Sequence, residues 1–457
     1  MNVEQVHKSQ QDFFKTRQTV DVSYRIKCLK RLKIAIETRE KDIYKALATD
    51  LSKSEFEAFL TEYNVIIEEL KNYIYKTNKL SLPKKVRPSI LNFPSRSKRY
   101  PEPYGNTLII SPWNYPFQLA LGPLIGAIAA GNTVLLKPSE FTTATSQLIK
   151  EIIEEAFEKG HVYVLLGDAQ IAQKLTALPW NYIFFTGSPA VGKKIYQAAA
   201  KHLTPVTLEL GGKNPCVVDN TAQIKVAAKR IVWGKFLNAG QTCIAPDYLL
   251  VHNDVKEKLI KEIKNQIYEF FGSEVKTSPD LPRIIKNDQF DRLIEMLENE
   301  TVLEGGDYDR ASLYLAPTLI DEPSRDSKVM QEEIFGPILP VISFENKEDL
   351  ELWIDSYEKP LGAYCFTSNS KFEKWFLNRF SFGGGVINDS IVQFINDRLP
   401  FGGVGNSGIG SYHGEKTFET FSHYKSVVHR GTWIDLPLKY APYKGKLKTV
   451  KKLLQWL

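Results

Sequence analysis

Residues 182–197 read YIFFTGSPAVGKKIYQ, and this stretch shows how the chain is built. An apolar run of the β type ends in a glycine, and a run with helical spacing follows almost directly. Such a tight strand-to-helix connection is typical of parallel β-α-β units. Small residues let the backbone approach a pyrophosphate at the anion-favouring N-terminus of the helix. A plain β-α turn is the alternative to a cofactor site formed by Gly187, Ser188, Pro189, Ala190, Val191 and Gly192.

The same alternation extends in both directions from this stretch. Helix-like runs separate further strand-like runs, which lie at 106–111, 132–137, 162–166 and 205–210. The pattern predicts an α/β fold with a doubly wound parallel sheet, which binds ligands outside the carboxyl ends of its strands. A second alternating series, from about residue 222 to about residue 410, predicts a second α/β domain.

The remaining segments depart from this pattern. Residues 1–80 show the apolar spacing of helices. Residues 83–105 are rich in proline, arginine and lysine and predict an extended excursion, and 423–430 predict one more strand. These segments therefore lie outside the two alternating α/β series.

The net charge of +6 resides at the C-terminus, where residues 436–457 contain six lysines and no acidic residue. The body of the chain is near neutral, which argues against nucleic acid as a partner. Residues 446–457 have helical spacing with lysines on one face. This fits either a weak contact with a membrane surface or a docked helix with a solvated basic face. The apolar face consists of Leu447, Val450, Leu454 and Leu457.

Composition limits the class of protein. A chain of 457 residues with 43% hydrophobic residues is long enough for two or three globular domains. Its first residues contain no apolar segment of the secretory type, and the apolar stretch 119–131 is too short to span a bilayer. Four widely spaced cysteines suit neither a disulfide framework nor a zinc site, and seven histidines lack metal-ligand spacing. We therefore expect a cytoplasmic protein without a metal site.

Three residues have types and positions that suit catalysis. Cys243 lies in the small-residue turn of NAGQTCIAPDYLLV, residues 238–251, where it is either a nucleophile or an inert buried residue. Glu209 lies inside an apolar strand-like run, which suits a general base or a carboxylate paired with a structural lysine. Asn114 follows the strand-like run 106–111, where its amide suits an oxyanion donor or ordinary turn chemistry.

Weaker signals concern a cofactor. Lys137 and Glu140 in LLKPSE suit hydrogen bonds to ribose hydroxyls or a solvated charge pair. Glu333 and Phe335 in QEEIFGP are weak evidence by themselves. The GxGxxG pattern at 403–408 follows no parallel strand and no acidic residue closes a β-α-β unit after it, so we interpret it as a flexible loop.

The motifs together, in this order, resemble the aldehyde dehydrogenase superfamily from about residue 20 to about residue 430. The motifs are PWNYPF, KPSE, FTGSPAVG, LELGGKNP, GQTC, EEIFGP, GGGVIND and LPFGGVGNSGIG. The short N-terminal region, NAGQTCIAPDY and YAPYKGKLK resemble the class 3 branch, which acts on fatty and aromatic aldehydes. The resemblance implies oxidation of an aldehyde to the acid with NAD or NADP.

The resemblance also assigns roles. Cys243 corresponds to the nucleophile that forms a thiohemiacetal and then a thioester, Glu209 to the base for hydrolysis, and Asn114 to the oxyanion donor. Lys137 and Glu140 correspond to positions near the adenosine ribose, and the residues of the 187–192 turn to positions near the phosphates. Glu333 and Phe335 correspond to contacts of the nicotinamide ribose and ring.

Finally, the resemblance implies the domain organisation and assembly. An NAD(P)-binding domain covers 1–82 and 101–208, a catalytic domain covers 209–412, and an oligomerisation flap with the tail covers 83–100 and 413–457. A homodimer is expected. Three alternatives stay open: an acylating enzyme that uses coenzyme A, a cofactor-free thiol hydrolase and a catalytically idle relative. The physiological aldehyde and the choice between NAD and NADP also stay open.

Overall fold

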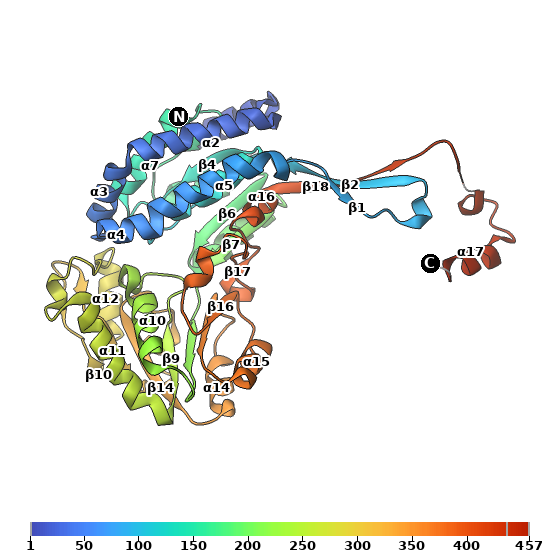
Figure 1. The fold of residues 1–457 in the computed structure, drawn as a ribbon. Helices are drawn as coiled ribbons and strands as arrows, with labels where there is room; N and C mark the ends of the chain where they lie inside the picture. Colours follow the sequence, from blue (N-terminus) through green and yellow to red (C-terminus); the bar gives the residue numbers. More distant parts are fainter. Residues whose placement is uncertain (1, 436, 456–457) are drawn as a thin grey trace. The chain divides into compact units, whose positions relative to one another are not determined.

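The computed structural model describes residues 2–435 and 437–455, and the chain separates into two compact units. The larger unit comprises Met1–Leu80 and Pro103–His423, and the smaller one comprises Ser81–Glu102 and Tyr424–Leu457. Figure 1 labels the elements of both units.

The larger unit contains the six-stranded sheet that the first alternating series predicts. Its central five strands are parallel, and the strand order reverses between β3 and β6, which makes their carboxyl ends the switch point of a doubly wound sheet. The sheet order is β17 (Gly408–Ile409), β7 (Val206–Leu210), β6 (Tyr182–Gly187), β3 (Asn106–Ile110), β4 (Thr133–Lys137) and β5 (Val162–Val164).

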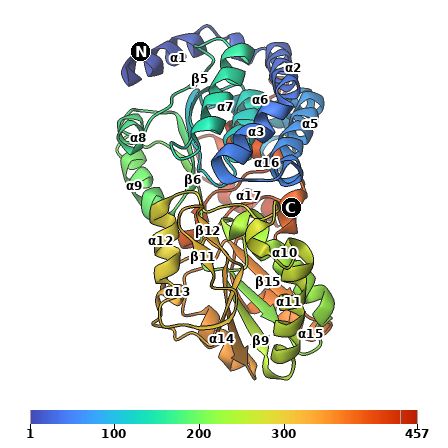
Figure 2. The same ribbon diagram turned by 90° about the vertical axis from the view of Figure 1, so that its left-hand side faces the viewer.

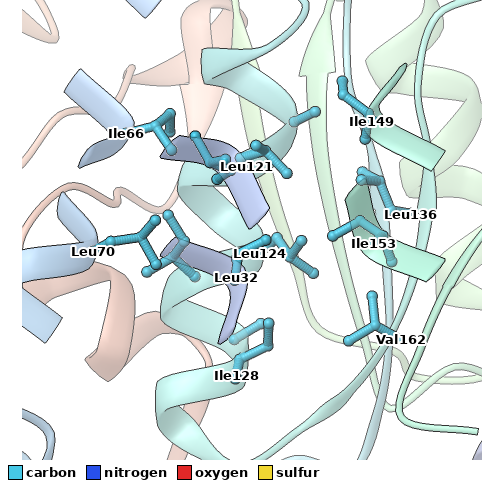
Figure 3. Packing of buried hydrophobic residues seen from close by; sticks show 14 of the residues in the cluster. Leu32, Ile66, Leu70, Leu121, Leu124, Ile128, Leu136, Ile149, Ile153 and Val162 are labelled. Carbon is cyan, nitrogen blue, oxygen red and sulfur yellow. The ribbon is translucent and has the colours of Figure 1, made fainter. Parts of the chain in front are cut away.

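Helices cover both faces of this sheet (Figure 2). On one face pack α2 (Val22–Thr38), α5 (Asn64–Leu80), α6 (Gln118–Ala130) and α7 (Thr143–Ala156). On the other face pack α1 (Val3–Lys15), α8 (Ala169–Thr176) and α9 (Pro189–Ala200). Figure 3 shows Leu121 and Leu124 of α6 between Leu70 of α5 and Leu136 of β4. The wholly buried α6 explains why its sequence is apolar all round.

The N-terminal helical region is interrupted more often than its apolar spacing suggests. The chain leaves helical geometry at Arg39, so that α3 (Glu40–Leu51) starts a separate helix. After α4 (Glu55–Ala58), one π-helical turn, η2 (Phe59–Tyr63), precedes α5. π-helical turns occur frequently at functional sites.

The second predicted series forms a seven-stranded sheet. Its strands are parallel except for β10 at one edge. The order is β10 (Thr301–Glu304), β13 (Thr318–Asp321), β14 (Ile338–Phe344), β9 (Tyr248–His252), β8 (Pro215–Val218), β15 (Gly362–Phe366) and β16 (Gly384–Ile387). One face carries α10 (Ile224–Phe236) and α11 (Lys256–Phe271). The other carries α12 (Asn287–Glu295), α13 (Lys328–Gln331), α14 (Lys347–Ile354) and α15 (Ser370–Arg379).

The glycine-rich segment 403–408 corrects one expectation. The rejected GxGxxG pattern does not form a loop alone, because β17 pairs antiparallel with β7 and extends the six-stranded sheet. Gly408 is the direct partner of Glu209, and a Cβ at Gly408 would lie 2.5 Å from the carbonyl oxygen of Leu208. The helix α16 (Glu415–Thr420), which the pattern did not predict, follows.

The smaller unit contains a three-stranded sheet of β1 (Lys84–Val86), β2 (Ser95–Pro103) and β18 (Ser422–Arg430). β18 confirms the strand predicted at 423–430. The C-terminal helix α17 (Lys446–Leu454) exposes Leu447 and Leu454. Leu457, the fourth predicted member of its apolar face, lies outside the described residues. The boundaries of the three proposed domains stay a prediction.

Candidate functional site

The predicted site residues follow the carboxyl ends of neighbouring parallel strands in the larger unit. Asn114 follows β3, Lys137 ends β4, Gly187 ends β6 and Glu209 lies one residue from the end of β7. Parallel strands bring these ends to one edge of the sheet, so residues far apart in sequence meet there. Cys243 reaches the same region from the loop that connects α10 to β9.

A cavity of about 670 Å³ joins the catalytic candidates. Cys243 and Glu209 both line it, together with Tyr115 and Phe401. Trp113 packs edge-on against Phe335, with 5.3 Å between the ring centroids. Most of the remaining lining is apolar and includes Leu60, Leu119, Trp233, Ile244, Ile391 and Phe394.

The loop before Cys243 has a backbone that few sequences adopt. The residues Asn238 and Ala239 both have left-handed dihedral angles, and Gly240 has a φ of 74°. A Cβ at Gly240 would lie 2.3 Å from the carbonyl oxygen of Gly336, so this position requires glycine. On the other side, the Asn214 amide donates to the Cys243 carbonyl at 2.8 Å. The loop therefore fixes the position of the thiol.

Cys243 differs from the other cysteines in its access. It is partly exposed, whereas Cys28, Cys216 and Cys365 are buried. Burial in the cavity wall, together with the nearby Glu333 and Glu209 carboxyls, raises the pKa of the Cys243 thiol to about 12. The thiol is therefore protonated at neutral pH in the free protein, and a nucleophilic role requires a change in its surroundings.

Glu209 is a buried acid without a partner. Its side chain is 3% exposed, and neither carboxyl oxygen has a hydrogen-bond partner among the described residues. The alternative of a carboxylate paired with a structural lysine is therefore wrong. Desolvation raises the pKa of Glu209 well above its usual range, so the resting group is a neutral acid.

Asn114 is tied to the loop of Cys243. Its Nδ2 donates to the carbonyl of Gln241 at 3.0 Å, which leaves the second N–H of the amide for another acceptor. Its own carbonyl accepts from the Nδ2 of Asn238 at 2.8 Å and from the Nζ of Lys53 at 3.2 Å. A further contact joins the hydroxyls of Tyr115 and Thr242 at 2.7 Å.

The turn at 187–192 fits a phosphate group. Ser188 caps α9, and its hydroxyl accepts from the N–H of Val191 at 3.4 Å. Added Cβ atoms would lie 2.5 Å from the Phe185 side chain at Gly187 and 2.6 Å from the Leu210 side chain at Gly192, so a larger residue at either position would require those side chains to shift. The N–H groups of the first turn of α9 and its dipole favour an anion there.

The two charged positions after β4 pair with each other. The Nζ of Lys137 lies 2.7 Å from Oε2 of Glu140, and it also donates to the carbonyl of Pro138 at 3.2 Å. Lys137 is only 3% exposed, so the pair is anchored in the protein rather than freely solvated. Their contacts with a ribose stay a prediction.

Glu333 and Phe335 follow the short helix α13. The Glu333 carboxyl fills the space beside Gly211, where a Cβ would lie 2.1 Å from its Oε2. Its Oε1 has no hydrogen-bond partner among the described residues, and burial raises its pKa to about 8. Phe335 has a left-handed φ of 52°, which is the kind of strain that protein structures hold at functional sites.

The sequence interpretation missed the buried charges that support these residues. Lys213 binds Asp247 at 2.7 Å and donates to two carbonyls of the 329–332 segment, which carries the chain toward Glu333. A second group, Lys53, Glu57 and Glu62, lies behind Asn114. No sequence signal marks this group, because Lys53 lies in the connection between α3 and α4 and the two glutamates lie in the elements that follow.

The described residues contain neither a metal cluster nor a membrane-spanning helix. Among them, no cluster of three or more histidine, cysteine, aspartate or glutamate side chains has the arrangement of a metal site. No helix in that part of the chain has the length and apolar composition that crossing a membrane requires.

The raised pKa of Cys243 predicts how iodoacetamide labels it. Without cofactor, the labelling rate should rise about tenfold per pH unit from about pH 7 to about pH 10, because the thiolate fraction grows until the pKa is reached. Addition of NAD⁺ should accelerate labelling at neutral pH. Labelling of a Cys243→Ser variant supplies the background. A plateau below about pH 9 in the free protein, or no effect of NAD⁺, would contradict this account.

Comparisons with known proteins agree with this geometry. The model of the aldehyde dehydrogenase family matches residues 1–427. The chain is 45% identical to 4,4'-diaponeurosporen-aldehyde dehydrogenase of Staphylococcus aureus, over 98% of each chain. It is 41% identical to the dimeric NADP-preferring aldehyde dehydrogenase of Canis lupus familiaris, over 95% of this chain and 96% of that one.

A solved structure extends the likeness to three dimensions. The substrate-bound state of Staphylococcus aureus AldH superposes with a TM-score of 0.97 at 45% identity, covering 99% of this chain and all of that chain. Several further relatives are named as family 3 aldehyde dehydrogenases, which confirms the class 3 resemblance. The chain belongs to the aldehyde dehydrogenase family, whose reaction is the oxidation of aldehydes with NAD or NADP.

Proposed function

We propose that this protein oxidises apolar aldehydes, aliphatic of medium or long chain or aromatic, by acylation of Cys243 and hydrolysis assisted by Glu209. One observation carries the proposal: a partly exposed thiol and an unpartnered buried carboxyl line the same cavity. Burial of the Glu209 carboxyl without a hydrogen-bond partner costs free energy of folding. A catalytically idle relative would gain nothing in return for that cost.

The first step is attack of the Cys243 thiolate on the aldehyde carbon. The oxygen then carries a negative charge, and two donors are available for it: the free N–H of the Asn114 amide and the backbone N–H of Cys243. Both are held by the loop contacts described above. The loss of one such donor typically lowers the rate by about 10²–10³-fold.

The residues present fit a dinucleotide. The N-terminus of α9 would hold its phosphates, the Lys137–Glu140 pair the adenosine ribose, and Glu333 with its orphan oxygen the nicotinamide ribose. When bound, NAD or NADP accepts the hydride from the carbon attached to sulfur. Cys243 has no histidine to activate it, and we expect the bound cofactor and local dipoles to lower the pKa of the thiol.

Glu209 completes the reaction by taking a proton from the water that attacks the thioester. It needs to be ionised for this step, and its raised pKa makes it a strong base once ionised. An enzyme that transfers the acyl group to coenzyme A has no such need for a base. The retained Glu209 therefore favours hydrolysis.

Replacement of Glu209 separates these steps. In Glu209→Gln, about one equivalent of reduced cofactor should form per site in a rapid burst, and turnover should then fall about 10²–10⁴-fold because the thioester persists. Cys243→Ser should show no burst. Steady turnover of Glu209→Gln at the rate of the unaltered protein would contradict the proposed role. Restoration of turnover by coenzyme A would instead identify the acylating enzyme.

The substrate class follows from the cavity. Its lining is largely apolar, and the relative from Staphylococcus aureus is named for 4,4'-diaponeurosporen-aldehyde, which supports an apolar substrate. The name of the canine relative supports NADP as well as NAD.

Chain length should therefore control efficiency. Across aldehydes of about two to about sixteen carbons, we expect kcat/KM to rise roughly two- to fourfold per methylene while the cavity still buries the added group. Steady-state kinetics with NAD and with NADP measure this dependence and the cofactor preference. A kcat/KM that is highest for the two-carbon aldehyde would contradict an apolar substrate.

We also propose a cytoplasmic homodimer that forms through the flap at 83–100 and the β18 strand. The name of the dimeric canine relative supports the dimer, and the exposed Val86 and Val428 of the small sheet supply apolar surface for it. The four free, widely spaced cysteines suit a reducing compartment. Light scattering of the full chain measures the oligomeric state directly.

The basic tail is proposed to contact membrane surfaces weakly. Residues 437–455 contain six lysines and no acidic residue, and Leu447 and Leu454 of α17 are exposed. Such a helix combines apolar burial with attraction to anionic lipids.

Removal of the residues after 436 tests this contact. The full chain should sediment with vesicles that contain anionic phosphatidylglycerol and less with neutral vesicles, and the shortened chain should lose this difference. High salt should weaken the binding of the full chain because it screens the charges. Equal sedimentation of the full and shortened chains would contradict the proposed contact of the tail with membranes.

A further inference from the structure

Three charged side chains are buried behind the catalytic loop of the larger unit. Lys53, Glu57 and Glu62 are 2%, 6% and 0% exposed, and they come from a short segment between α3 and α5. Buried charges are costly unless they are paired and hydrogen-bonded. The contacts of these three side chains therefore indicate the role of the segment.

Lys53 and Glu62 form a fully enclosed ion pair. The Nζ of Lys53 lies 2.6 Å from Oε1 of Glu62, and both side chains have no solvent exposure. The same Nζ donates to the carbonyl of Asn114 at 3.2 Å and lies 4.1 Å from the ring centroid of Tyr115. The ion pair thus ends on the backbone of the residue that we propose as the oxyanion donor.

The second oxygen of Glu62 holds the segment that follows Asn114. It accepts from the N–H groups of Phe117 and Gln118 at 2.8 and 3.2 Å, where α6 begins. These N–H groups belong to the helix start and have no partner inside the helix. The backbone from residue 114 to residue 118 is therefore held from both ends by one ion pair.

Glu57 holds the opposite side of Asn114. Its Oε1 accepts from the N–H of Asn238 at 3.0 Å, and this N–H belongs to a residue with a left-handed backbone. The Nδ2 of Asn238 then donates to the carbonyls of Asn114 and Gln241 at 2.8 and 3.2 Å. Since the Asn114 amide itself donates to Gln241, the contacts form a closed ring.

The π-helical turn η2 explains how one segment supplies both carboxylates. Residues five apart lie on different faces of an α-helix, because its period is 3.6 residues. The i to i+5 hydrogen bonding of Phe59–Tyr63 accommodates one additional residue between Glu57 and Glu62. Both side chains can then reach the region of Asn114.

We propose that Lys53, Glu57 and Glu62 are positioning residues that fix the backbone of Asn114 and so aim its amide at the oxyanion. The inference rests on the proposed role of Asn114 in aldehyde oxidation. The position of the amide depends on its backbone, and a displacement of about 1 Å in an active site can lower a rate about 10²-fold.

The test uses a p-nitrophenyl ester, because its attack by Cys243 requires the thiol and the oxyanion donors but no redox cofactor. The release of nitrophenolate measures acylation directly. For Lys53→Met we expect acylation to fall about 10²-fold with a KM changed less than about threefold. In an Asn114→Ala background, the same substitution should lower acylation less than about threefold, since the amide that it positions is already absent.

A second pair of variants keeps the test independent of the ion pair. Glu57→Gln retains an oxygen that accepts from Asn238 and should keep most of the acylation rate, whereas Glu57→Leu removes it and should lower the rate. Arg25→Met is the control for general destabilisation. Arg25 is a buried cation that binds the carbonyl of Ala129 at the other end of α6, so its loss should lower thermal stability but leave acylation unchanged.

The outcomes distinguish a failure of the positioning role of Lys53, Glu57 and Glu62 from a failure of the oxyanion role of Asn114. An equal effect of Lys53→Met with and without Asn114, or an equal loss in Glu57→Gln and Glu57→Leu, would overturn the positioning role. An unaltered rate in Asn114→Ala alone would instead show that the proposed oxyanion role of Asn114 is wrong.

Discussion

Desolvation of two acids in one apolar cavity is the constraint on which the chemistry depends. The Cys243 thiol and the Glu209 carboxyl are both held neutral because the charged forms are poorly solvated there. The resting site therefore has little nucleophilic or basic activity. In the proposed mechanism, the groups become reactive when the bound cofactor or the oxyanion donors stabilise the charge that appears. A site of this kind protects its thiol until the substrate is in place.

The positions of these groups are set by the backbone, through strand ends and a strained loop, and not by ion pairs at the reacting atoms. The carboxyl ends of β3, β6 and β7 supply Asn114, the turn at Gly187 and Glu209. Left-handed residues and a required glycine shape the loop of Cys243. The Lys53–Glu62 ion pair is fully enclosed and lies behind the loop, where it contacts the backbone of Asn114.

Local signals explain what the sequence predicted well. Apolar runs of strand length predicted the five parallel strands of the six-stranded sheet, and a glutamate inside such a run made Glu209 a candidate. A glycine-led turn beside a cysteine made Cys243 a candidate. Lys53 and Glu62 carried no comparable signal, because charged side chains ordinarily face solvent. Their burial depends on Asn114, which lies 61 residues from Lys53 along the chain. The pairing of β17 with β7 was missed for the same reason, since two residues of a glycine-rich loop become a strand only through a distant partner.

The central claim is that the substrate becomes covalently attached to Cys243. Acid quenching during steady oxidation of a medium-chain aldehyde, followed by tryptic digestion and mass spectrometry, examines this directly. The peptide that contains Cys243, residues 236–256, should carry the added mass of the acyl group. Formation of the carboxylic acid at full rate with that peptide unmodified, at every quench time, would contradict the account.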